Sequence, residues 1–321
     1  MYLNLLFRPL RVIADKFNVL QMGMIASERV FKVLENEDFM PLPESISPPL
    51  LPPSPKGGKE ASAPSVPPVF SPSGGAGVEF DKVWFAYNDE QYVLKNISFH
   101  IQPGETLAIV GHTGSGKTSI ISLLNRLYHI QKGAIKIDNK RIEDYEIDVL
   151  RSKIAVVLQD VFLFSGSVYD NVTLRNKNIR KEQVIEAAKM IGVHDFIMRL
   201  PAGYDYNVME RGATLSLGQR QLLSFIRALL YNPSILILDE ATSSIDTESE
   251  MLIQHAIDKL ISGRTSIIIA HRLSTIRKAN TILVLDKGEI KESGSHEELL
   301  SKQGLYAQLH KMQFEREEAA V

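Results

Sequence analysis

The chain has 321 residues, of which 44% are hydrophobic and 23% charged, and both values are ordinary for a globular protein. Its formal net charge of −2 gives no general basic field that would attract nucleic acid or an anionic membrane surface. Without cysteine, the chain can form no disulfide framework, thiolate metal site or thiol nucleophile.

The first segment, from Tyr2 to Asn36, has the periodicity of a helix with one mostly apolar face. Its opening apolar run ends at Arg8, whereas a membrane-spanning helix needs about 20 mostly apolar residues. The segment also lacks the basic region, apolar core and cleavage site of a secretory signal. We therefore expect no membrane span in the chain as written. An ordinary docking helix and the end of a longer element both remain open.

Residues 41–77 form the second segment and hold 11 of the 15 prolines, interspersed with serine, glycine and alanine. Proline removes backbone donors, and such a stretch buries too little apolar area to offset its ordering entropy. This composition favours a semi-extended linker. A docking site for a proline-reading domain is the less favoured alternative.

From Val78 onward the pattern is globular, with strands and helices alternating. Four short β-branched runs stop abruptly at polar residues: "TLAIVG" at the loop 111–118, "KIAVVL" at Gln159, "SILIL" at Asp239, and "TSIIIA" at His271. Fully apolar strands that alternate with helices predict a parallel sheet covered on both faces. Ligands bind outside the carboxyl ends of such strands. The four endings together therefore predict one site.

The loop "GHTGSGKT", from Gly111 to Thr118, matches the pattern G-x-x-x-x-G-K-[ST] directly after a strand. Its glycines allow backbone N–H groups to converge on phosphate oxygens, and a helix predicted to begin near Lys117 adds its positive end. Lys117 places a charge near the β- and γ-phosphates, and the Thr118 hydroxyl can ligate Mg²⁺. A Gly-rich turn with an unrelated lysine is the alternative.

The other strand-end residues fit the same chemistry. A carboxylate at Asp239 would be costly after an apolar strand unless it binds an ion or water. Glu240 is placed to act as a general base on an attacking water. Taken alone, the two acidic residues could cap a helix, His271 could be structural, and Gln159 could be a solvated loop residue. Their common sheet edge favours the functional interpretation.

A second helix start lies in "LSLGQRQLLSFIRALL", where Ser216 and Gln219 have the spacing of a capping box. A capped N-terminus with Gly218 in its first turn can bind an anion. The chain therefore carries two phosphate-type cradles about a hundred residues apart. The residues alone leave open whether the two meet on one nucleotide.

These motifs, in this order, resemble those of the ATP-binding cassette (ABC) superfamily from about Val78 to the end of the chain. "GHTGSGKT" is similar to its Walker A motif, "ILILDE" to Walker B and "LSLGQ" to its signature. Gln159 resembles the Q-loop glutamine, Asp246 lies in the "SSID" of the D-loop, and His271 matches the switch histidine. The resemblance implies a P-loop NTPase (ABC ATPase) domain of α/β class, with an antiparallel β subdomain, a helical subdomain and a preceding N-terminal helix.

The same resemblance implies a site for ATP and Mg²⁺. Tyr87 lies where the family stacks an aromatic ring on adenine, although it could be a strand residue packed in a hairpin. The implied catalytic residues are Gln159, Glu240 and His271, and the implied magnesium ligands are Thr118, Gln159 and Asp239. The implied nucleotide-binding residues are Tyr87, Gly111, His112, Thr113, Gly114, Ser115, Gly116, Lys117, Thr118, Ser119, Ser216, Gly218, Gln219 and Asp246.

Finer features resemble the exporter branch of the superfamily. "DVFLFSGSVYDNV" and "ERGATLSLGQRQ" are similar to segments that contact transmembrane coupling helices. The opening stretch resembles the cytosolic end of the last transmembrane helix and its elbow. We therefore expect three parts: a truncated transmembrane end at 1–37, a linker at 38–77 and an ATP-binding domain at 78–315. The implied partners are a second such domain, as homodimer or heterodimer, and a transmembrane domain, with no nucleic acid. The implied location is the cytoplasmic face of the cell membrane.

Two departures from the family pattern stand out. The proline-rich linker is much longer than usual, and the signature has Leu217 where the family usually has glycine. The second change is either neutral or a mark of a heterodimer with unequal sites. A soluble ABC protein acting on ribosomes or DNA and a nucleotide-binding regulator without turnover are the competing classes.

Overall fold

The computed structural model describes residues 16–17, 20–32, 34–35, 75–88, 91–239, 247–269 and 273–318. The chain divides into two compact units, Met1–Lys56 and Gly57–Val321. In the first unit, residues 16–17, 20–32 and 34 are helical, which confirms the predicted helix over this part of 2–36. Most of the linker expected at 38–77 lies outside the described residues.

The helix of the first unit exposes its apolar side chains: Phe17, Leu20, Met22, Met24, Ile25, Val30, Phe31 and Leu34. Glu28 and Lys32, one turn apart, form an ion pair at 2.8 Å. Across the described part of the chain, no helix combines the length and the apolar character needed to cross a bilayer.

A six-stranded sheet forms the centre of the second unit, with the order β12-β11-β3-β10-β9-β6. Five of its strands run parallel to their neighbours, and β12 is an antiparallel edge. These strands are β3 (Thr106–Val110), β6 (Ile154–Val157), β9 (Ile235–Asp239), β10 (Thr265–Ile269), β11 (Thr281–Asp286) and β12 (Glu289–Gly294). The four predicted apolar strands therefore all lie in the parallel part of one sheet, as expected.

A second, antiparallel sheet has the order β2-β1-β4-β5, and a two-stranded ribbon pairs β7 with β8. The strands are β1 (Val78–Ala86), β2 (Tyr92–Ile101), β4 (Lys132–Ile137), β5 (Lys140–Arg141), β7 (Gly166–Ser167) and β8 (Asn207–Val208). This sheet is the antiparallel part that the family resemblance implied. The backbone is already packed just before β1, because Gly77 N–H donates to Asp138 Oδ1 at 2.9 Å.

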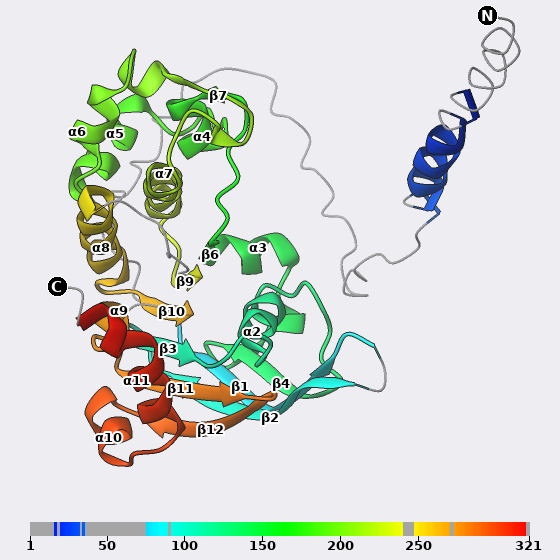
Figure 1. The fold of residues 1–321 in the computed structure, drawn as a ribbon, viewed down its shortest axis with the longest axis vertical. Coiled ribbons are helices and arrows are strands. Elements are labelled where there is room, and N and C mark those ends of the chain that lie inside the picture. Colours follow the sequence, from blue (N-terminus) through cyan, green and yellow to red (C-terminus); the bar gives the residue numbers. More distant parts are fainter. Residues whose placement is uncertain are drawn as a thin grey trace, which may run out of the picture. The chain divides into compact units, whose positions relative to one another are not determined.

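Helices α4 to α7 gather at one end of this unit, at the top of Figure 1, and the antiparallel sheet lies at the other end. The α-helices are α2 (Lys117–Leu124), α3 (Ile147–Ser152), α4 (Val168–Thr173), α5 (Lys181–Met190), α6 (His194–Arg199), α7 (Leu217–Leu230), α8 (Thr247–Ile261), α9 (Leu273–Ile276), α10 (His296–Ser301) and α11 (Leu305–Glu318). Short 3-10 turns lie at η1 (Ile142–Asp144), η2 (Gly203–Asp205) and η3 (Glu210–Gly212).

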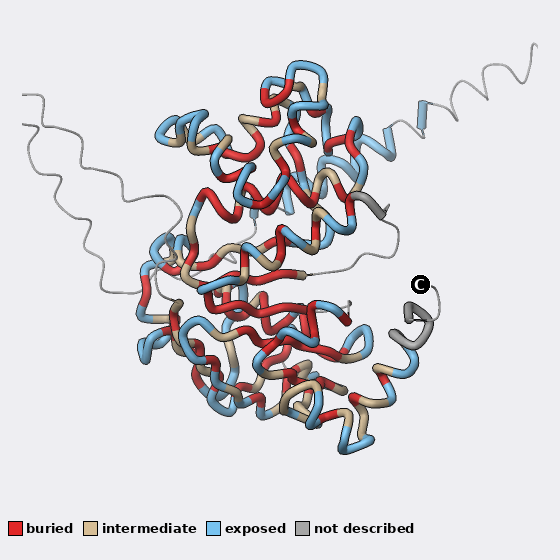
Figure 2. The backbone as a smooth tube through the Cα atoms, turned by 90° about the vertical axis from the view of Figure 1, so that its left-hand side faces the viewer, coloured by how far each residue is buried: buried red, intermediate tan, exposed pale blue. Residues whose placement is uncertain are grey.

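Two apolar cores lie on opposite faces of the parallel sheet, because successive strand side chains point to opposite faces. On β3, Ala108 and Val110 belong to the core shared with α4 to α8, and Leu107 and Ile109 to the core shared with α2 and the antiparallel sheet. The side chains of the other parallel strands alternate between the same two cores. Burial on both faces explains why these strands are apolar throughout, and Figure 2 shows buried residues running through the middle of this unit.

Candidate nucleotide-binding site

The loop between β3 and α2 turns sharply at glycines. Gly111 has φ +153°, and a Cβ there would collide with the Leu285 carbonyl oxygen of the neighbouring strand β11. Gly116 has φ +108°, and a Cβ there would lie 2.6 Å from Leu94 Cδ2. Both positions therefore need glycine for its backbone conformation and its small size.

The predicted helix begins at Lys117, as expected, with Gly116 at its N-cap. Gly116 has no side chain to bond the first N–H groups, and the first turn of α2 contains no acidic residue. This end of the helix thus presents N–H donors and the positive end of the helix dipole without a competing carboxylate on its own turn. Such a terminus favours an anion.

The Lys117 side chain is buried and folds back across the loop. Its Nζ donates to the carbonyl oxygens of Gly111 at 2.8 Å and His112 at 3.0 Å, which places the ammonium inside the curve of the loop. Burial lowers the pKa of this ammonium below its ordinary value of 10.5, and the Asp239 carboxylate acts in the opposite direction. Within the described residues, the buried Ser115 Oγ has no hydrogen-bond partner.

A pocket of about 530 Å³ opens in front of this loop. That volume lies in the usual range for small-molecule sites, about 300 to 1,000 Å³. It is lined by residues from the end of β1, β2, the loop, α2 and the ends of β6, β9 and β10: Tyr87, Val93, Thr113, Gly114, Gly116, Lys117, Thr118, Ser119, Gln159, Asp239 and Ile269. Gln159 and Asp239 thus meet the loop at one sheet edge, as the strand endings predicted.

Three of these pocket residues offer oxygen atoms suited to Mg²⁺. Thr118 contributes a hydroxyl, Gln159 an amide carbonyl and Asp239 a carboxylate. No cluster of three or more His, Cys, Asp or Glu occurs among the described residues. A few hard oxygen ligands fit Mg²⁺, which keeps waters and substrate phosphates in its shell and rarely uses a dedicated all-protein cage.

Tyr87 lies directly after β1 at the pocket edge and is about half exposed. Its hydroxyl is 3.0 Å from Ser119 Oγ on α2. Its ring packs edge-on against Phe85 and Tyr128, with ring centroids at 4.7 and 5.0 Å. The ring is therefore held beside the phosphate loop by contacts from two elements.

Sequence reasoning missed three residues of this neighbourhood. Val93 and Ile269 line the pocket, and Tyr128 supports Tyr87. Tyr128 follows α2 by a few residues and carries no motif, so its proximity to Tyr87 could not be inferred from spacing. Ile269 immediately precedes the "AHR" segment on β10, and its place at the end of an apolar strand could have marked it.

Three predicted residues, Glu240, Asp246 and His271, lie outside the described residues. The structure does place the strand ends that precede two of them. Asp239 and Ile269 are register partners on the parallel strands β9 and β10. The strand ends that precede Glu240 and His271 in the chain therefore lie side by side.

The second cradle has the predicted local structure. Ser216 Oγ accepts from Gln219 N–H at 3.2 Å, and Ser216 N–H donates to Gln219 Oε1 at 3.0 Å, which confirms the capping box at the start of α7. Leu217 is half-buried in the first turn, next to the buried Gly218.

The two cradles do not share a pocket within the described part of the chain. Ser216 and Gln219 line a separate cavity of about 680 Å³, together with residues of α6, α7 and α8. None of the residues that line it also lines the pocket at the phosphate loop. In these described residues, the signature and the phosphate loop thus line different pockets.

A glycine-turned loop between a central parallel strand and a helix, with a buried lysine and a strand-end aspartate, defines a P-loop nucleotide-binding domain. The model of the family described as "ABC transporter" matches residues 94–243. The chain is 46% identical over 312 residues to a probable multidrug resistance ABC transporter ATP-binding/permease protein, YheH, of Bacillus subtilis, covering 97% of this chain and 43% of that protein. It is 40% identical over 316 residues to an ATP-dependent lipid A-core flippase of Syntrophus aciditrophicus, covering 98% of this chain and 49% of that protein.

Among solved structures, a bacterial Atm1-family ABC exporter with ATP bound matches with a TM-score of 0.71 and 36% identity, over 98% of this chain and 51% of that one. The chain thus spans about half the length of the relatives it matches. It belongs to the ABC transporter family and carries the ATP-binding domain, an ATPase domain, of an exporter-type member.

Proposed function

We propose that this chain hydrolyses ATP as part of an exporter, in which ATP-driven pairing of two such domains is coupled to movement of a substrate across the membrane. One observation carries the proposal: the pocket that joins Lys117, Thr118, Gln159 and Asp239 at one sheet edge. These side chains supply a phosphate-binding cation, metal ligands and a polar group for water, which phosphoryl transfer requires.

Each residue has a proposed part in the reaction. Lys117 and the loop N–H groups bind the phosphates, and Tyr87 stacks on the base. Thr118, Gln159 and Asp239 hold Mg²⁺, which when bound neutralises charge on the phosphate oxygens.

Glu240 accepts a proton from the attacking water, whose oxygen bonds to the γ-phosphorus while the bond to the bridging oxygen of ADP breaks. His271 contacts the γ-phosphate through the imidazole. Gln159 also lies where it can orient the water, because it faces the same pocket as Lys117 and Asp239.

The separate position of the signature favours a two-chain site. Ser216 and Gln219 line a different cavity from the phosphate loop, although their capped helix start suits an anion. In the proposed dimer, the signature end of α7 in one chain closes over the phosphate loop of its partner, and Asp246 lies at the junction. The partner is a second copy or a related chain.

Exposed apolar residues support the proposed contact with a transmembrane domain. Leu158, Phe162, Phe164 and Leu174 are each about half exposed and line two neighbouring pockets beside the segment after Gln159. Exposed aromatic rings in pockets are typical of a surface that receives a partner. The proposed location is the cytoplasmic face of the cell membrane, and the exporter class is favoured over a soluble ABC protein.

The test is ATP-driven pairing of a variant that binds ATP without turning it over. We would purify Glu240→Gln, add ATP with Mg²⁺ and measure the mass in solution by light scattering, with Glu240→Gln/Lys117→Met as the matched control. The expected result is a shift from monomer to dimer that the control lacks. A monomer that binds ATP would overturn self-pairing and implicate a different partner chain. Steady hydrolysis by wild type that survives Glu240→Gln would refute the role of Glu240.

A further inference from the structure

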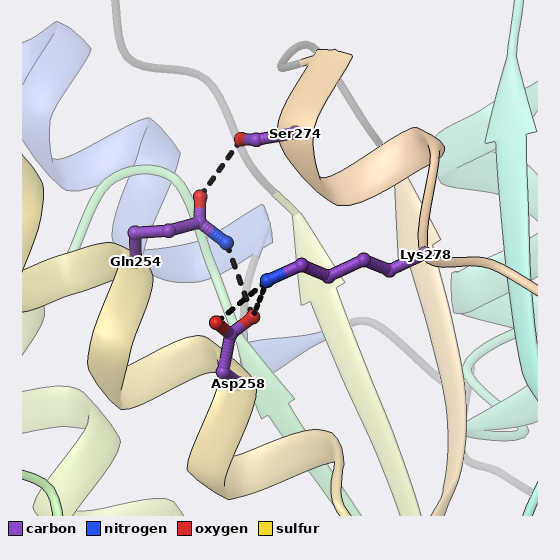
Figure 3. A network of polar contacts seen from close by, with 4 residues as sticks. All are labelled: Gln254, Asp258, Ser274 and Lys278. Atoms are coloured by element: carbon purple, nitrogen blue, oxygen red, sulfur yellow. Dashed lines mark hydrogen bonds and ion pairs between the residues drawn. The ribbon is translucent and has the colours of Figure 1, made fainter.

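A network of four polar side chains joins α8 to the segment around α9 (Figure 3). Ser274 Oγ donates to Gln254 Oε1 at 2.9 Å, and Gln254 Nε2 donates to Asp258 Oδ1 at 3.2 Å. Lys278 Nζ donates to both Asp258 oxygens, at 2.8 and 2.7 Å. Gln254 and Asp258 lie one turn apart on α8, so one face of that helix holds both Ser274 and Lys278.

The two helices joined in this way follow the two strand ends of the nucleotide site. Helix α8 begins eight residues after Asp239, and α9 begins four residues after Ile269. Asp239 and Ile269 are register partners on neighbouring strands. The short segments that carry Glu240 and His271 thus start at paired strand ends and lead to helices that the network ties together.

Apolar contacts also join these two helices. Leu273 and Ile276 of α9 belong to the same buried core as Ile253 and Ile257 of α8. The hydrophobic effect itself is non-directional, and polar contacts add constraints on how α9 is rotated. Hydrogen bonds have directional geometry, and three of the four in the network cross from α8 to the α9 segment.

Helix α8 also reaches the second cradle. It packs against α7, whose first turn carries the signature residues. Ser249, Met251 and Leu252 of α8 line the cavity that Ser216 and Gln219 line. The first turns of α8 therefore line the cavity beside the signature, and its following turns hold the α9 segment.

We infer that Gln254, Asp258, Ser274 and Lys278 are positioning residues for ATP hydrolysis. By holding the α9 segment against α8, they fix the positions of the two helices that follow Glu240 and His271 in the chain. This inference rests on the proposed function and deepens it. It requires that the network govern turnover and leave ATP affinity unchanged, because none of the four residues lines the pocket at the phosphate loop.

The expected effect is limited by the strength of the contacts. The ion pair is partly exposed, with side-chain exposures of 50% for Lys278 and 37% for Asp258. Such pairs contribute little to stability. Removing Lys278 should therefore lower kcat by roughly two- to fivefold. Removing Lys278 and Ser274 together should lower kcat by about tenfold or more, since the two contacts hold the same helix.

The experiment compares Lys278→Met, Lys278→Arg and Ser274→Ala/Lys278→Met in the full 321-residue chain, with kcat, KM for ATP and thermal unfolding measured for each. The matched control is Lys181→Met, which breaks the Lys181–Asp205 pair at 2.9 Å on the helical part. We expect a loss of kcat in the two methionine variants with KM and unfolding temperature unchanged, recovery in Lys278→Arg, and no change in the control.

Several results would overturn the inference. Wild-type kcat in Lys278→Met, a rise in KM in place of the loss of kcat, or a loss that Lys278→Arg does not restore would each show that the network does not position the site. A loss that follows a lowered unfolding temperature would assign the network to stability alone. Absence of hydrolysis in the wild-type chain would refute turnover by paired copies of this chain, and the inference with it.

Discussion

Gly111 and Gly114 belong to the same phosphate loop but have different surroundings. Gly111 has φ +153° and faces the Leu285 carbonyl, whereas Gly114 has φ +81° and open space where a Cβ would lie. We expect Gly111→Ala to lower the free energy of unfolding by about 3 kcal/mol, because strained backbone and a steric collision add. Gly114→Ala should lower the free energy of unfolding by only about 1 kcal/mol, because alanine there meets only the cost of the left-handed backbone conformation.

Urea unfolding of the two variants beside wild type measures the difference. An equal loss of unfolding free energy in the two variants would contradict the close approach of Gly111 to β11. If Gly111→Ala unfolds like wild type but no longer binds ATP, the loop has rearranged instead of straining the fold.

Hydrogen bonds within the loop hold the Lys117 side chain in place. The motif predicted a lysine directed at phosphates, and the structure places its Nζ on the carbonyls of Gly111 and His112. These bonds hold the long side chain inside the curve of the loop, so little of its conformational entropy remains to be lost on binding an anion.

At the scale of elements, the C-terminal helices α10 and α11 meet around a titratable pair. His296 Nδ1 lies 2.7 Å from Tyr306 Oη, and its ring centroid is 5.7 Å from that of His310. Burial lowers the pKa of His296 below 6.5, Arg277 and His310 lower it further, and Glu297 opposes them. The folded protein therefore binds this proton less readily than the unfolded chain.

Because the pKa of His296 is lower in the folded protein than in the unfolded chain, the sign of its effect on stability with pH is defined. The stability contributed by neutral His296 is fully present above pH 6.5 and is lost as the pH falls from there through the lower folded pKa. We expect the urea midpoint of wild type to fall between about pH 7.5 and about pH 5.5 by more than that of His296→Gln. Parallel pH profiles of the two proteins would show that His296 does not carry this dependence.

At the scale of the whole molecule, ATP binding should stabilise the folded state. A ligand that binds only the folded protein adds about 2.7 kcal/mol at a free concentration of about 100 times Kd. For a domain of this size, that raises the Tm by roughly 5 to 10 °C. Lys117→Met should abolish most of the shift, because it removes the buried cation of the loop, whereas Lys181→Met should retain it.

Thermal unfolding with and without ATP checks this expectation. An equal shift in Lys117→Met would place the stabilising contact elsewhere than the loop. The absence of any shift in wild type, with binding measured separately, would mean that the unfolded chain binds ATP as well.

Features that depend on neighbouring residues were predictable from the sequence. The helix at Lys117, the capping box at Ser216 and the four apolar strands were confirmed, because each follows from spacing within a few residues. The meeting of Gln159 and Asp239 with the loop was also predictable, since parallel strands end at one edge. The roles of Glu240, Asp246 and His271 remain predictions.

The amino-acid sequence by itself thus determined the loop, the strands and the family, because a phosphate loop and an apolar strand are each defined by a short stretch of consecutive residues. Only the tertiary structure decided that β10 lies between β3 and β9, that Tyr128 supports Tyr87, and that Ser274 and Lys278 bond to α8. It also decided that the two cradles line separate cavities. The physical reason is that these contacts join residues far apart in the chain, where packing of the whole sheet and its helices, and not local spacing, sets the geometry.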